Sequence, residues 1–123
     1  MAESFDVQIV SVDLGAYIGA TGRPLIHLPA KGGGITVLEA HAIGNAAGTA
    51  VGLLLVSFTD VGTPVLSGTI GSFEGTIIYA EGVAHEATIS TAFVDDGCWI
   101  GVDQTSGTAP ANTVLSVSYV TGK

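Results

Sequence analysis

Basic residues are scarce in this sequence of 123 residues. Lysine and arginine together occur three times, against eleven aspartates and glutamates, and the formal net charge is −8 at pH 7. A protein that binds nucleic acid displaces the counterions around the phosphates with many cationic side chains. Proteins that bind anionic membranes use clusters of the same residues. The composition therefore predicts no binding to nucleic acid and no binding to a membrane.

Cysteine is nearly absent. Cys98 is the only one in the chain, which excludes an internal disulfide and a disulfide-rich secreted scaffold. Its neighbour is Trp99, in an apolar segment, where we expect a buried and unreactive thiol.

Charge of either sign is also low, at 11% of the residues, and the mean hydropathy is +0.58. Two interpretations of this apolar excess stay open: a soluble β monomer rich in Ser and Thr, or a protein with apolar subunit contacts. The uncharged stretch 40–59 is long enough to suggest a membrane helix. However, its continuous apolar part covers only 51–56, so we predict a buried strand there.

The dominant hydrophobic period is two residues, which is typical of strands. Leu115, Val117 and Tyr119, for example, alternate with serines. Nine segments show strand character: 5–12, 25–28, 35–43, 50–58, 65–70, 76–80, 86–93, 98–102 and 115–119. Segment 51–58 is apolar on both faces, which predicts a central strand covered on both sides.

Turn residues separate these segments about every ten residues, and we expect hairpin connections at 31–34 and at 95–97. The pattern predicts an all-β fold, namely a jelly-roll-like β-sandwich of about eight or nine short antiparallel strands. A closed barrel is the alternative. We expect a single domain over 1–123, in which 1–12 form an N-terminal arm or an edge strand.

The first strand segment changes its hydrophobic phase. Phe5, Val7 and Ile9 first alternate with polar residues. The apolar residues of the next alternation are Val10 and Val12, which shifts the pattern by one position. The change predicts a β-bulge near Ile9–Val10, or a strand shared between two environments. We take these five residues as a candidate assembly interface, because an extended arm can add a strand to a neighbouring chain.

No catalytic or cofactor-binding motif is present. The chain has no G-x-S-x-G elbow, and the glycines after Lys31 lead into a strand instead of a phosphate-binding helix. We therefore predict that the protein is not an enzyme and binds no cofactor. An enzyme with a site invisible to sequence motifs stays a third hypothesis.

Metal ligands are not clustered along the sequence. The three histidines are far apart and no H-x-H pair of the cupin type exists; Glu39 and His41 share a strand face, whereas His85 and Glu86 lie on opposite faces. We predict no metal site and solvated or hydrogen-bonded roles for these residues. Whether Asp95, Asp96 and Asp103 hold Ca²⁺ stays open, since a turn already explains the first two.

The last third of the chain resembles small structural proteins of tailed bacteriophages. Residues 97–102 match the pattern G-x-W-[IV]-x-[VF], a polar loop follows, and 115–122 resemble a last strand of the form V-x-V-x-Y-x-x-G. The pattern covers about the last 40 residues, and the rest is similar in composition alone. The family most like it is that of head decoration (cement) proteins. The resemblance implies an oligomer, expected as a homotrimer, that sits on the outer capsid surface of the virion.

Our leading functional hypothesis is therefore a virion structural protein. It would bind the major capsid protein and stabilise the shell lattice. The alternative is a β-sandwich module of a tail or head fibre that binds a receptor or a glycan, with Trp99 and Tyr17 as stacking platforms.

Overall fold

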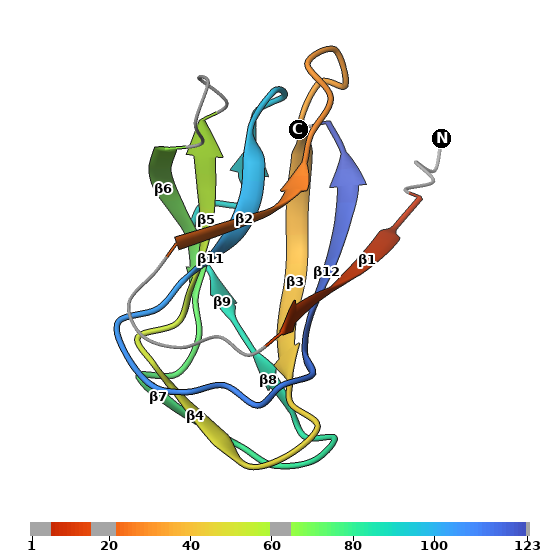
Figure 1. The fold of residues 1–123 in the computed structure, drawn as a ribbon. Helices are drawn as coiled ribbons and strands as arrows, with labels where there is room; N and C mark the ends of the chain where they lie inside the picture. The colour runs from red at the N-terminus through yellow and green to blue at the C-terminus, as the bar shows by residue number, and fades with distance from the viewer. Residues whose placement is uncertain (1–5, 16–21, 60–64, 123) are drawn as a thin grey trace.

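The computed structural model describes residues 6–15, 22–59 and 65–122. These residues form twelve strands and no helix, and every strand pair is antiparallel. The predicted all-β class is confirmed. Two large sheets face each other in a β-sandwich-like arrangement (Figure 1).

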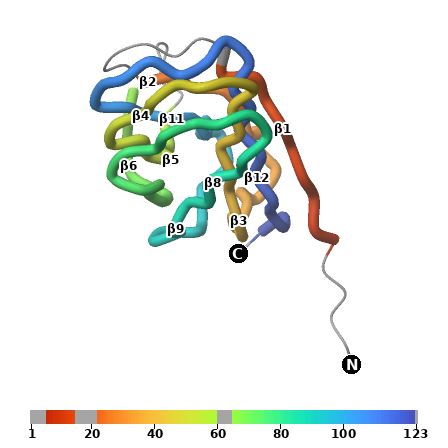
Figure 2. Tube along the Cα trace, turned by 90° about the horizontal axis from the view of Figure 1, so that it is seen from below, coloured from red at the N-terminus to blue at the C-terminus, as the bar shows by residue number. Residues whose placement is uncertain are grey.

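The first sheet has β3 near its centre. Its order is β1 (Gln8–Gly15), β12 (Thr113–Thr121), β3 (Ile35–Ile43) and β10 (Phe93–Val94), and β8 (Ala84–Glu86) also pairs with β3. Since β12 occupies one edge of β3, β8 and β10 share the other edge at opposite ends of the strand. β1 is an edge strand of this sheet, and it lies on the opposite side of the molecule from β6 (Figure 2).

The second sheet has β5 in its middle. Its order is β2 (Gly22–His27), β11 (Trp99–Asp103), β5 (Leu54–Thr59), β6 (Val65–Ser72) and β9 (Thr88–Ile89). A separate pair, β4 (Gly48–Val51) with β7 (Thr76–Tyr79), lies at the end of the molecule drawn at the bottom of Figure 1.

The core lies between the two sheets. Leu115 and Val117 of β12 are fully buried, as are Ile100 and Val102 of β11. β5 is covered on both faces, as predicted: Leu55 packs in the core, and Val56, which points the opposite way along the strand, is buried too.

The number of strands differs from the eight or nine that the sequence predicts. Two predicted segments are each divided: 50–58 into β4 and β5, and 86–93 into β9 and β10, while β8 overlaps a predicted segment only at Glu86. The first division falls at Gly52, which has φ +65° and donates its N–H to the carbonyl of Gly75. A left-handed residue of this kind ends one strand and redirects the chain.

The two predicted hairpins are also wrong. Residues 31–34 connect β2 to β3, and residues 95–97 connect β10 to β11, but in each case the two strands belong to different sheets. The local turn signals are genuine: Gly97 has φ +75°, and the backbone N–H of Asp96 donates to Asp95 Oδ1. A tight turn reverses the chain whether or not the strands beside it pair, so its residues do not reveal that the chain changes sheet.

The predicted bulge at Ile9–Val10 is absent. β1 pairs with β12 in a regular register from Gln8 to Asp13, and the irregularity falls between Asp13 and Gly15. The change of hydrophobic phase has another cause: Ile9 lies on the outward face of β1 and is exposed, while Val10 points inward.

Candidate functional site

The predicted assembly interface divides between the two faces of β1. Val7 and Ile9 are 55% and 71% exposed. Val10 and Val12 are half-buried and pack against the core of their own chain. Phe5 lies outside the described residues. The surface available to another molecule is therefore Ile9 and, just before the strand begins, Val7, together with the backbone edge of β1.

That backbone edge is open within the described residues. β12 occupies one side of β1, and no other described strand pairs with it. An edge strand presents a row of backbone N–H and C=O groups with which another chain can pair, and many proteins protect such edges with charged residues or proline. Asp13 is the single charged residue of β1, and the strand contains no proline.

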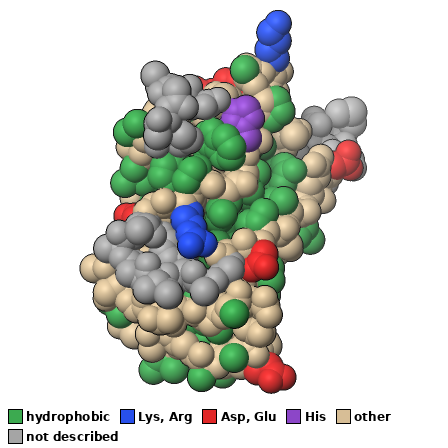
Figure 3. All heavy atoms as spheres, in the orientation of Figure 1, with side chains coloured by type: hydrophobic (Ala, Val, Ile, Leu, Met, Phe, Trp, Pro, Cys, Tyr) green, Lys and Arg blue, Asp and Glu red, His purple; other side chains and the backbone are tan. Residues whose placement is uncertain are grey.

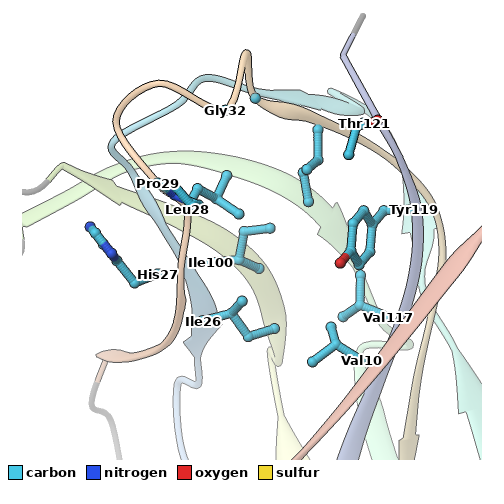
Figure 4. A pocket seen from close by; sticks show the side chains of 12 residues that line it. Val10, Ile26, His27, Leu28, Pro29, Gly32, Ile100, Val117, Tyr119 and Thr121 are labelled. Carbon is cyan, nitrogen blue, oxygen red and sulfur yellow. The ribbon is translucent and has the colours of Figure 1, made fainter.

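A pocket of about 230 Å³ opens between the two sheets at the end where β1 and β2 face each other (Figure 4). Its walls are mainly aliphatic: Val10 and Val117 of the first sheet face Ile26 and Ile100 of the second. Tyr119, also in its lining, donates its hydroxyl to Gln8 Oε1 at 3.0 Å. His27 belongs to the lining, but its side chain points away from the space (Figure 4). Such a pocket suits an apolar group and offers no nucleophile with a base beside it.

An apolar row crosses the outward face of the second sheet. His27 pairs with Trp99 in register, Trp99 with Phe58, and Phe58 with Leu66, so the row runs across β2, β11, β5 and β6. The His27 and Trp99 rings have centroids 4.9 Å apart. Trp99 is half-buried, and its indole Nε1 has no hydrogen-bond partner among the described residues. Tyr17, the second predicted stacking residue, lies outside the described residues.

Cys98 is half-buried and packs against the core, so the thiol is less enclosed than the sequence predicts. Lys31 is exposed in the loop between β2 and β3.

On the face shown in Figure 3, hydrophobic side chains gather in the upper half of the molecule, and the few acidic side chains lie apart from one another.

The structure brings some of the candidate metal ligands together and separates others. Glu39, His41 and Glu86 meet on the outward face of the first sheet, whereas Asp95, Asp96 and Asp103 form no such group among the described residues. Glu86 joins because β8 pairs with β3. No sequence signal reveals a pairing between segments more than forty residues apart. As predicted, His85 points to the other face, where its Nδ1 lies 2.7 Å from Glu74 Oε1.

Comparison with known proteins gives no relative: no family model, no curated protein and no solved structure matches the chain. Among the described residues, no helix is long and apolar enough to cross a membrane.

Proposed function

We propose that this chain is a virion structural protein that binds the outer surface of a capsid and stabilises the shell lattice. Its partners would be the major capsid protein and further copies of itself, in a homotrimer. The observation that carries the proposal is β1, an edge strand with one side unpaired among the described residues and with Val7 and Ile9 exposed.

The chemistry of β1 suits strand addition. When an extended segment joins a sheet edge, main-chain hydrogen bonds supply affinity and alternate side chains supply specificity. Ile9 would bury an aliphatic side chain in such a contact, which contributes about 1.5–3 kcal/mol when burial is complete. The inward neighbours Val10 and Val12 already fix the strand to its own core. The strand is therefore held in position before a partner arrives, and little ordering is needed on binding.

The charge of the chain supports the outer surface of the shell as its location. With three cations and a net charge of −8, the protein is repelled by packed nucleic acid. A surface that meets capsid protein and water has no such penalty. The low proportion of charged residues, 11%, leaves apolar surface for contacts between subunits.

We also propose that the two sheets form a jelly roll. The pairing supports this topology, because the strands pair as in one long hairpin that has been rolled up: β1 with β12, β2 with β11, β3 with β10, and β5 with β6. Jelly rolls occur in viral capsid domains, lectins and cupins. The H-x-H pair of cupins is absent from this sequence.

A matched pair of isoleucines tests the role of β1. Ile9 and Ile78 are both 71% exposed, and Ile78 lies on β7, in the separate strand pair away from β1 (Figure 1). We expect Ile9→Asp to weaken co-sedimentation with purified particles of the source virus by about tenfold or more, since 1.4 kcal/mol is a factor of ten. Ile78→Asp should bind like the unaltered protein. Equal binding of the two variants would refute an interface at β1.

A fibre module that binds a glycan is a second candidate, favoured by the apolar row from His27 to Leu66. A sugar ring stacks on an aromatic side chain of the kind that Trp99 places on this outward face. This reading predicts saccharide binding that Trp99→Ala abolishes while the far-UV circular dichroism spectrum is retained. A glycan array without any signal would exclude it.

A further inference from the structure

Two carboxylates and an imidazole meet on the outward face of the first sheet. Glu39 and His41 are two residues apart on β3, and Glu86 of β8 pairs directly with His41. The backbone N–H of Ala87 donates to the carbonyl of Ala40 at 2.9 Å, which continues the pairing beyond β8. The three side chains therefore project from paired strands and not from a loop.

The distances suit a single metal ion. One potential ligand atom from each of Glu39, His41 and Glu86 lies within 4.8 Å of the other two, and His41 Nε2 is 3.9 Å from Glu86 Oε1. Ligand atoms placed at about 2.0–2.2 Å around a tetrahedral Zn²⁺ are roughly 3.3–3.6 Å apart. The Glu86 side chain is 59% exposed, so it has room to rotate toward His41.

The electrostatics also favour a cation at this position. Within the described part of the chain, neither Glu39 nor Glu86 forms an ion pair with lysine or arginine. Glu39 and Glu86 bring two carboxylates close together on this face, and like charges that lie close together repel each other. A divalent cation held between them removes the repulsion.

A serine lies next to the group of Glu39, His41 and Glu86. Ser118 of β12 pairs directly with Glu39, so both side chains lie on the same face. Its Oγ is buried and has no hydrogen-bond partner among the described residues. If Glu39 turns toward a bound ion, this hydroxyl is the neighbouring donor on the same face for its carboxylate, as groups around a metal site are when they orient a ligand.

We propose that Glu39, His41 and Glu86 bind one divalent transition-metal ion of the zinc type. The imidazole ligand selects this class, because Ca²⁺ and Mg²⁺ prefer oxygen ligands alone. Three protein ligands leave a fourth position of a tetrahedral ion toward solvent. The ion would tie β8, a strand of three residues, to β3 and so stabilise this part of the sheet. Ser118 lies between Glu39 and Ile9 on this face, so the site adjoins the proposed contact surface of β1 but shares no ligand residue with it.

Zinc titration of the untagged protein tests the site. After dialysis against a chelator, isothermal titration calorimetry with ZnCl₂ should show one ion per chain. His41→Ala and Glu86→Gln should each weaken binding by about tenfold or more. Glu81→Gln is the matched control, since it makes the same change in charge at an exposed residue between β7 and β8. It should leave the affinity unchanged.

A second readout reports the ligands directly. Co²⁺ in a site with three protein ligands should give visible absorption bands, which His41→Ala should remove while the circular dichroism spectrum stays the same. Mg²⁺ at the same concentration should not displace the cobalt. The proposal is overturned by wild-type protein that binds no zinc, or by both variants binding it as tightly as Glu81→Gln.

Discussion

Val10 and Val117 lie directly opposite each other across β1 and β12, and both line the pocket between the two sheets. Ile9 pairs in the same way with Ser118, on the outward face. Adjacent residues of β1 therefore serve different purposes: the inward side chain holds the strand to the core, and the outward one is available to another molecule.

The two faces of β1 should respond differently to a charge. Val10→Asp should lower the free energy of unfolding by about 2–4 kcal/mol, because the carboxylate would lie against the apolar core. Ile9→Asp should change it by no more than about 0.5 kcal/mol, as is usual for an exposed position. Urea denaturation of both variants measures the difference. Equal losses of stability would mean that β1 does not have this orientation.

Gly101 is predicted to be irreplaceable in the middle of the second sheet. A Cβ atom at this position would collide with the carbonyl oxygen of Arg23 and would lie 2.9 Å from the Phe58 ring. We expect Gly101→Ala to cost about 3 kcal/mol or more, because backbone must move to admit the methyl group. Gly75→Ala is the control, since nothing lies within 4 Å of its Cβ position. Thermal unfolding that gives the same midpoint for both variants would contradict this packing.

Tyr79 should make the protein sensitive to alkali. Its side chain is 1% exposed, and burial raises the pKa of its hydroxyl from 10.0 to about 12. The unfolded chain therefore loses this proton at lower pH than the folded chain does. The contribution of Tyr79 to stability is fully present below pH 10 and is lost as the pH rises through 12.

Replacement of the hydroxyl isolates this effect. Two pKa units correspond to about 2–3 kcal/mol, so unfolding free energies measured between pH 9 and about pH 12 should fall more steeply for the unaltered protein than for Tyr79→Phe. Parallel curves would show that the hydroxyl is not held in its neutral form by burial.

Self-association should depend on the outward face of β1. Light scattering after size exclusion should give the mass of a trimer for the unaltered protein and for Ile78→Asp. The double variant Val7→Asp, Ile9→Asp should give a smaller mass, because two apolar contacts are lost. If the unaltered protein is a monomer, the proposed trimer is wrong. If the double variant is still a trimer, the subunit interface lies on another surface.

Local patterns in the sequence predicted individual strands well. The alternation of Leu115, Val117 and Tyr119 with serines corresponds to β12, with Leu115 and Val117 fully buried. The predicted segment 35–43 has the bounds of β3. These successes rest on a period of two residues, which depends only on near neighbours in the chain.

Relationships between distant segments were not predictable in this way. Nothing local shows that Glu86 pairs with His41, or that residues 95–97 lead from one sheet to the other. The exposed Ile9 misled the interpretation of β1, because an apolar side chain on the outward face looks in sequence like a change of register. The apolar pocket and the group of Glu39, His41 and Glu86 depend on such long-range pairings, and they became visible only in the structure.

The copy number of the protein in purified particles tests the central claim most directly. Quantitative mass spectrometry of particles from the source of this gene should find hundreds of copies, in a fixed ratio to the main shell protein. Such a ratio is the result expected of a protein that binds the capsid lattice. A few to a few dozen copies would place the protein in the tail, a fibre or a vertex, and its absence from the particles would contradict a structural role in the virion.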